Sequence, residues 1–193
     1  HPGREETLVS QNTDATAVIN NIILGDHGKP VSFNKQMTHH LVGVDTSFLE
    51  QVSNIIFIRN PAQIISSYAA VRPDVQMEDI GIAAQWKLFL QLKETQQNPV
   101  VLDSGVMLQD PAKVLHALCE SLGIPWYEAM LHWPPGLKPY DGVWAKYWYD
   151  NVHRSTGFKK QETSSRELPA YLRPLYEESK AYYDQLLPYT INA

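Results

Sequence analysis

An arginine that follows an apolar run is the residue of this sequence best placed to bind an anion. Residues 55–58 are all apolar, Arg59 comes next, and Asn60 and Pro61 have the form of a helix N-cap with proline at the first helical position. Free N–H groups and the positive end of the helix dipole favour a phosphate at such a turn, and a guanidinium can hold two of its oxygens. Ser67, two turns into the helix, adds a hydroxyl. An arginine in this position also occurs for structural reasons alone, so this segment leaves both interpretations open.

A second group of polar residues lies late in the chain, in the aromatic and proline-rich residues 133–160. A loop of this length inside a compact domain is usually functional. Its basic part contains Arg154, Ser155, Gly157 and Lys159, and the glycine allows the backbone to approach a ligand closely. The alternative is a surface loop that is anchored by its aromatic side chains and carries solvated charges.

Lys35, His39 and His40 form a third polar patch. An imidazole with an ordinary pKa of about 6.5 suits general-base catalysis. Adjacent histidines point to opposite faces of a strand, so at most one faces a site and no chelated metal is expected. If a strand runs on from Lys35, Met37 and His39 share its face, which favours His39 as the base. A structural hydrogen-bonding role for either histidine stays open.

Composition indicates an ordinary globular α/β protein. The chain has 193 residues, of which 44% are hydrophobic and 19% charged. A formal net charge of −5 argues against broad nucleic-acid binding, although a local basic pocket is compatible with it. Cys119 lies in an apolar helical pattern and is expected to be a buried hydrophobe. No apolar run approaches the roughly 20 residues of a membrane span, and no signal peptide is evident, so we expect a reducing, cytoplasmic location with no membrane partner.

Helical and strand-like segments alternate along the chain, which favours α/β layers within a single domain of residues 1–193. Residues 55–58 suit a strand that is covered on both faces, and residues 99–103 are a second segment that suits a strand. Expected strands are residues 31–35, 55–58 and 99–103, and expected helices are residues 8–24, 47–52, 61–71, 77–96, 111–122 and 167–187. Asp110 is expected to cap the helix of residues 111–122, with Pro111 at its first position.

Two of these segments resemble motifs of the sulfotransferase family. In that family an Arg-(Asp/Asn)-Pro turn, with a serine eight residues after the arginine, binds a 3′-phosphate, and Arg59 and Ser67 have this spacing. Residues 101–126 resemble the stretch in which a strand that ends in an acidic residue precedes an Asp-Pro helix and a Leu-Gly-Ile-Pro exit. The similarity is closest to a small branch found with branched-chain aminotransferase-like proteins, through residues 35–40, 58–61, 141–145 and 155–158.

The resemblance implies a P-loop NTPase-like, three-layer α/β fold with a mainly parallel sheet. It also implies a transferase that moves a sulfuryl group from 3′-phosphoadenosine 5′-phosphosulfate (PAPS) to a hydroxyl or amine of a small-molecule acceptor, without a metal. Arg59 and Ser67 would bind the 3′-phosphate of PAPS or of the product, adenosine 3′,5′-bisphosphate. Arg154, Ser155, Gly157 and Lys159 would close over the nucleotide. Lys35 with His39 or His40 would be catalytic, although Met37 stands where the better-studied sulfotransferases have their histidine.

The loop that holds the 5′-phosphosulfate in this family is not evident in the sequence. Residues 25–30 have two residues between their glycines where a P-loop has four, and Pro30 stands where Ser or Thr should be. We therefore expect a chain that lacks the N-terminal P-loop βα unit and is deficient in transfer when alone. The alternatives are a non-catalytic nucleotide- or phosphate-binding module that regulates a partner enzyme, and a P-loop kinase. The sequence indicates neither the acceptor nor the oligomeric state.

Overall fold

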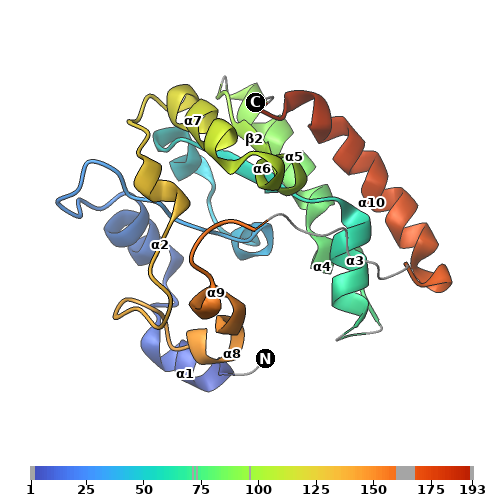
Figure 1. Cartoon of the computed structure of the whole chain (residues 1–193), viewed down its shortest axis with the longest axis horizontal. Coiled ribbons are helices and arrows are strands. Elements are labelled where there is room, and N and C mark those ends of the chain that lie inside the picture. The colour runs from blue at the N-terminus through green and yellow to red at the C-terminus, as the bar shows by residue number, and fades with distance from the viewer. Residues whose placement is uncertain (1–2, 71, 73, 96, 160–167, 192–193) are drawn as a thin grey trace. The chain divides into compact units, whose positions relative to one another are not determined.

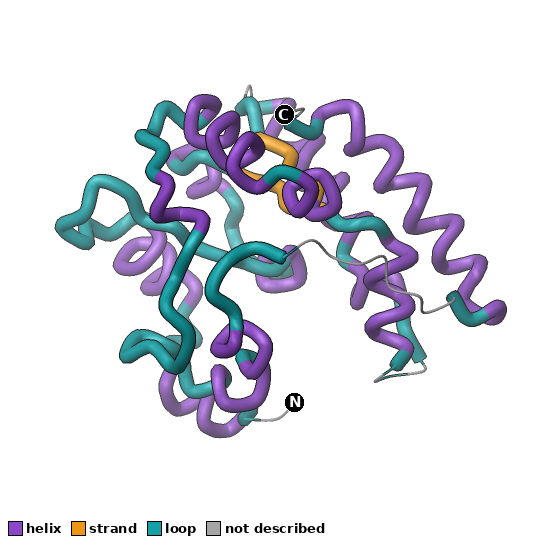
Figure 2. The backbone as a smooth tube through the Cα atoms, in the orientation of Figure 1, coloured by secondary structure: helices purple, strands orange, loops and turns teal. Residues whose placement is uncertain are grey.

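The computed structural model describes residues 3–70, 72, 74–95, 97–159 and 168–191. The chain forms two compact units: residues 1–35 with 127–158 make the first, and residues 36–126 with 159–193 make the second. In the described residues, two strands form one small sheet, and the other regular elements are helices (Figures 1 and 2). None of the helices in this part of the chain is both long and apolar enough to cross a membrane.

The sheet lies in the second unit and consists of two parallel strands. Strand β1 (Ile55–Ile58) pairs with β2 (Val100–Asp103) so that Ile58 lies opposite Asp103. The carboxyl ends of both strands therefore lie at the same end of the sheet, where the helices α3 (Pro61–Ala69) and α6 (Ser104–Gln109) begin. β2 is largely buried, whereas the prediction that residues 55–58 are covered on both faces is wrong, because Phe57 is 51% exposed.

Asparagine and aspartate caps start the helices that follow the strands. Asn60 caps α3 (Pro61–Ala69), Asp103 caps α6 (Ser104–Gln109), and Asp110 caps α7 (Pro111–Ser121). The sequence predicted α3 and α7 with both caps. It did not predict α6, because Asp103 reads as the end of a strand and the six residues of the helix are too few to show a period.

The helix expected over residues 77–96 is two helices, α4 (Met77–Ile80) and α5 (Ile82–Glu94). Gly81 separates them with φ 75°, a left-handed conformation that glycine adopts without a steric penalty. The C-terminal helix α10 (Arg173–Leu186) contacts both α5 and α3. On the sheet, α6 contacts β2 and α5 contacts β1. The core of this unit includes the fully or almost fully buried side chains of Ile58, Ile65, Ile82, Leu92, Val101, Val114 and Leu186.

The first unit is built from short helices. Its N-terminal part has α1 (Arg4–Ser10), α2 (Ala15–Val18) and a π-helical turn (Ile19–Ile23), so the helix expected over residues 8–24 is interrupted, with Asp14 capping α2. Its later part has a 3₁₀ turn (Glu128–Leu131), α8 (Ala145–Trp148) and α9 (Asp150–Arg154). The strand predicted over residues 31–35 is wrong: these residues form no regular structure, and Phe33 is exposed.

The parallel strands and the many helices confirm the α/β class. The three-layer P-loop arrangement, the single domain and the missing N-terminal unit stay predictions. The expected helix of residues 47–52 is a 3₁₀ helix (Ser47–Gln51), and the C-terminal helix starts at Arg173. Residues 71, 96 and 167, at the predicted ends of three helices, lie outside the described residues.

Candidate functional site

Arg59 leaves the carboxyl end of β1 with its guanidinium oriented but not neutralised. Its Nε donates a hydrogen bond to Gln63 Oε1 at 3.0 Å, and the side chain is partly buried. Among the described residues, no carboxylate forms an ion pair with Arg59, and its two terminal nitrogens have no hydrogen-bond acceptor. A neutral amide thus fixes the direction of the cation and leaves its charge and two nitrogens for a ligand.

The backbone at the start of α3 is less available to an anion than the sequence suggested. Pro61 has no N–H, the Ala62 N–H donates to Asn60 Oδ1 at 2.9 Å, and the Gln63 N–H donates to Asn60 O at 3.0 Å. The expectation of free N–H groups at this turn is therefore wrong, because Asn60 satisfies them. An anion at this turn would be held mainly by side chains.

Ser67 lies on the same face of α3 as the side chain that orients Arg59. Gln63 and Ser67 are four residues apart, which places them on neighbouring turns of one helix face. Ser67 is exposed, whereas the adjacent Ser66 is buried, with 6% of its surface exposed. Among the described residues the Ser67 hydroxyl has no hydrogen-bond partner. We call Arg59, Gln63 and Ser67 the arginine face.

Asp103, at the end of the neighbouring strand, is fully used by the fold. Its Oδ1 accepts from the N–H groups of Gly105 and Val106 at 2.8 and 3.0 Å, and its Oδ2 accepts from the Tyr183 hydroxyl at 2.8 Å. Burial raises the pKa of Tyr183, and the hydrogen bond to Asp103 raises it further. The carboxylate nearest in register to Arg59 is therefore occupied by α6 and α10 and does not neutralise the arginine.

His39 and His40 do not lie on a strand. They belong to a 3₁₀ helix (Thr38–Leu41), and their rings meet edge to face with centroids 4.6 Å apart. His40 Nδ1 lies 3.1 Å from Gln36 Oε1. The argument that favoured His39 is therefore wrong, because it assumed that a regular strand continues from Lys35 to His39. Lys35 is exposed and belongs to the first unit. The catalytic roles of all three residues stay predictions, and the geometry prefers neither histidine.

Two residues of the late basic segment have partners within the first unit. The Ser155 hydroxyl accepts from Trp133 Nε1 at 2.9 Å and donates to Val152 O at 2.7 Å. Gly157 pairs with His132 in an isolated antiparallel bridge, and a Cβ at Gly157 would lie 3.0 Å from the Leu131 carbonyl oxygen. The close backbone approach expected at this glycine is therefore made to the chain itself.

Arg154 and Lys159 remain more available than Ser155. Arg154 is exposed and donates through Nη2 to Asn151 Oδ1 at 3.0 Å. Lys159 is exposed and falls in the second unit, whereas Arg154 falls in the first. A nucleotide-binding role for the four residues of this segment stays a prediction.

The first unit contains a pair of polar side chains that the sequence did not reveal. His153 Nε2 lies 2.9 Å from Asp141 Oδ2. The pKa of Asp141 is lowered, most of all by the backbone N–H of Lys138; burial opposes this effect, and the hydrogen bond to His153 lowers the pKa further. The two residues are twelve positions apart, with α8 between them and His153 in α9, so no single helical or strand period connects them. The available signal was that Asp141 belongs to the motif of residues 141–145 and that His153 directly precedes the basic residues from Arg154 onward.

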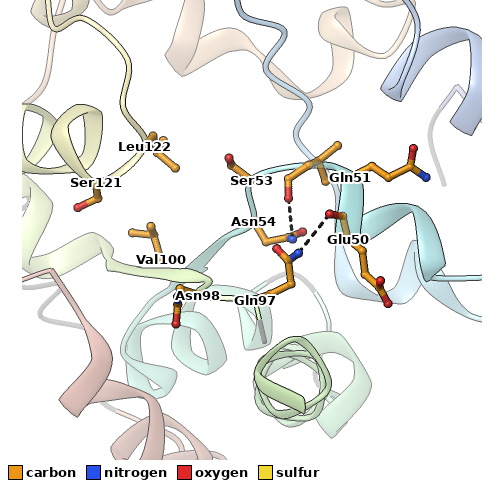
Figure 3. A pocket seen from close by; sticks show the side chains of 10 residues that line it. Glu50, Gln51, Ser53, Asn54, Gln97, Asn98, Val100, Ser121 and Leu122 are labelled. Carbon is orange, nitrogen blue, oxygen red and sulfur yellow. Dashed lines mark hydrogen bonds between the residues drawn. The ribbon is translucent and has the colours of Figure 1, made fainter. Parts of the chain in front are cut away.

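The structure also has a pocket of about 340 Å³ in the second unit (Figure 3). Asn54 and Val100 place it at the amino ends of the two strands, opposite the end that carries Arg59. Some of its amides are already bonded: Asn54 Nδ2 donates to Val52 O and Gln97 Nε2 donates to Glu50 O, both at 3.1 Å. The lining contains no basic side chain, so the pocket does not suit a phosphate. The lining residues are Glu50, Gln51, Val52, Ser53, Asn54, Gln97, Asn98, Val100, Ser121 and Leu122.

In the described part of the chain, no cluster of three or more His, Cys, Asp or Glu residues could hold a metal ion.

Comparison with known proteins gives a family match over almost the whole chain. A family model described as "Sulfotransferase domain" matches residues 1–183. Two curated proteins of Arabidopsis thaliana are similar: branched-chain-amino-acid aminotransferase-like protein 1 is 32% identical and protein 2 is 29% identical, each over 186 residues. The match covers 96% of this chain and 33% of either relative, so the chain spans about a third of their length. No solved structure matches the chain significantly.

Proposed function

The chain belongs to the sulfotransferase domain family, and from this premise we propose that it transfers a sulfuryl group from PAPS to a hydroxyl or amine of a small-molecule acceptor. Sulfotransferase domains generally use PAPS. Bound in the site, PAPS would supply the activated sulfuryl group, and the protein would have to hold the nucleotide, orient the acceptor and take up its proton.

The arginine face carries this proposal. A partly buried arginine with a neutral partner and two available nitrogens suits the bidentate binding of a phosphate. Ser67 lies on the same helix face, as a donor to one further phosphate oxygen. The 3′-phosphate that distinguishes PAPS from other adenine nucleotides is the group that we assign to Arg59 and Ser67.

The remaining assignments follow the family resemblance. Arg154 and Lys159 are exposed cations that would meet the nucleotide's phosphates, whereas Ser155 and Gly157 would shape the segment that carries them. Lys35 would stabilise charge on the transferring group, and His39 or His40 would accept a proton. The chain covers about a third of its curated relatives, so the activity of the whole protein is part of this proposal.

The test is calorimetric titration of the protein with adenosine 3′,5′-bisphosphate. The charge-assisted contact of Arg59 with the phosphate is worth about 1.5–3 kcal/mol, so Arg59→Ala should weaken binding by about tenfold or more. Arg173→Ala is the matched control, because it removes the same charge from an exposed arginine of the same unit that has no ion pair among the described residues. Unchanged affinity in Arg59→Ala, with the fold intact, would remove the basis of the assignment.

A further inference from the structure

The amide of Gln63 gives the guanidinium of Arg59 its direction. Gln63 Oε1 accepts from Arg59 Nε at 3.0 Å, and both side chains are partly buried. Arginine nitrogens can only donate hydrogen bonds, so the amide has to present its oxygen to Arg59 and its Nε2 away from it. Among the described residues, Nε2 of Gln63 has no hydrogen-bond partner. The contact therefore fixes one edge of the guanidinium without compensating its charge.

The place of Gln63 in α3 makes a neutral side chain unexpected there. Gln63 is the third residue of the helix, where the positive end of the helix dipole favours a carboxylate. The helix α4 follows this preference, because its third residue, Asp79, accepts from the Gln76 N–H at 3.0 Å. The first turn of α3 contains no acidic residue. A glutamate at position 63 would also gain a charge-assisted hydrogen bond with Arg59, so the stability of this turn favours glutamate over glutamine.

A carboxylate at position 63 would change what Arg59 can bind. The charge of Arg59 would then be compensated within the chain, and a phosphate on the same guanidinium would lie a few ångströms from a second anion. Like charges at such a distance repel strongly where the surroundings are partly buried. Glutamine supplies the same acceptor to Arg59 Nε without this repulsion. Fold stability and phosphate binding therefore make opposite demands on position 63.

We propose that Gln63 is the positioning residue of the phosphate site and that its neutral amide sets the affinity of Arg59 for the 3′-phosphate, an inference that rests on the proposed function. Gln63 holds Nε of Arg59, and the two terminal nitrogens of the guanidinium bind the phosphate oxygens. Arg59, Gln63 and Ser67 all belong to the second unit, so this arrangement does not depend on where the first unit lies.

The test measures two quantities on the full chain: the dissociation constant for adenosine 3′,5′-bisphosphate by titration calorimetry, and the free energy of unfolding by chemical denaturation. Gln63→Glu should weaken binding by about tenfold or more, because it adds a negative charge beside the phosphate. Its free energy of unfolding should be equal to that of the wild type or higher. Its affinity for adenosine 5′-monophosphate, which lacks the 3′-phosphate, should change much less. A residue with a merely structural role would lose stability and binding together.

Gln63→Met is the second variant, because it keeps the length of the side chain, adds no charge and removes the acceptor for Arg59 Nε. Its affinity for the bisphosphate should fall by roughly 2- to 13-fold, the effect of one hydrogen bond, and by less than in Gln63→Glu. Gln185→Glu is the matched control. It adds the same charge at an exposed glutamine of the same unit, which donates to the Ala181 carbonyl at 3.2 Å and holds no arginine, so its affinity should equal that of the wild type.

Wild-type affinity in Gln63→Glu, or equal losses in Gln63→Glu and Gln185→Glu, would overturn the role of Gln63 and leave the proposed function standing. A loss of affinity in Gln63→Glu that accompanies a matching loss of stability would overturn this role as well. A wild type that does not bind adenosine 3′,5′-bisphosphate would instead contradict the proposed function, and this inference with it.

Discussion

Arg59 and Arg72 show how differently two arginines of one unit are used. Arg72 is paired with the carboxylates of Asp74 and Asp79, at 3.3 and 3.8 Å, and both carboxylates raise its pKa, Asp74 the more. Arg59 has a neutral amide as its partner instead, and Asp103 is occupied by two backbone N–H groups and a tyrosine. A phosphate at Arg59 therefore would not have to displace a bound carboxylate, which makes this the stronger anion site of the two.

Ser67→Ala should weaken the binding of adenosine 3′,5′-bisphosphate less than Arg59→Ala does. A single hydroxyl hydrogen bond is worth about 0.5–1.5 kcal/mol, which corresponds to a change of roughly 2- to 13-fold in the dissociation constant. Ser66→Ala is the control, because Ser66 is the adjacent serine and is buried on another face of α3. Titration calorimetry of both variants checks this, and a larger loss in Ser66→Ala would show that the face of α3 has been assigned incorrectly.

Single residues were predictable where their chemistry is local. Arg59, Asn60 and Ser67 lie within nine residues, and the N-cap and helix period fix their relation. The pairing of Asp141 with His153 was not predictable, because it depends on how an irregular loop returns to α9. The same reason applies to the Trp133–Ser155 hydrogen bond, whose partners are 22 positions apart.

At the scale of elements, the hydrogen bond between α10 and the end of β2 should stabilise the fold. Tyr183 donates to the buried carboxylate of Asp103 at 2.8 Å, and Tyr183→Phe leaves that oxygen without this partner. The free energy of unfolding at neutral pH should fall by about 1–3 kcal/mol. Chemical denaturation of the two proteins measures this difference.

The pH dependence of Tyr183 follows from the direction of its pKa shift. Its pKa is raised in the folded state, mainly by burial, so the folded state retains the phenolic proton at pH values where the unfolded chain, with an ordinary pKa of about 10, has lost it. Its contribution is therefore complete below about pH 10 and declines as the pH rises further. Tyr183→Phe should lose less stability than the wild type above this pH, and equal pH slopes would contradict the assigned interaction.

Gly142 should be required for the turn that carries Asp141. A Cβ at Gly142 would overlap atoms of the Trp144 ring, so Gly142→Ala must displace this indole, whose Nε1 donates to the Tyr149 hydroxyl. We expect a loss of roughly 1–3 kcal/mol in the free energy of unfolding, typical of overpacking. In a Trp144→Ala background the same glycine change should have a much smaller effect, and an equal loss in both backgrounds would exclude the clash as its cause.

Elements with strong local signals were predicted correctly, and elements that depend on distant partners were not. The caps at Asn60 and Asp110, each followed by proline, located α3 and α7. The predicted strand at residues 31–35 has the alternating pattern of Val31 and Phe33, but a strand also needs a neighbouring strand, and these residues have none in the described structure. The break at Gly81 could not be predicted from periodicity, because apolar residues continue on both sides of it.

On the scale of the whole molecule, the family match and the length of the relatives set the frame. The match to the sulfotransferase domain runs over residues 1–183 and so includes both compact units. The relatives are named for likeness to branched-chain aminotransferases, and this chain matches a third of each. An overall charge of −5 means that binding of an anionic nucleotide depends on local cations, not on a general basic field.

The most direct test of the account compares the binding of adenosine 3′,5′-bisphosphate with that of adenosine 5′-monophosphate, which lacks the 3′-phosphate. The wild type should prefer the bisphosphate. Arg59→Ala should lose about tenfold or more in affinity for the bisphosphate and little for the monophosphate, so that the preference largely disappears. An unchanged preference in a folded Arg59→Ala variant would show that the 3′-phosphate is bound elsewhere, or that the chain does not bind this nucleotide as a sulfotransferase does.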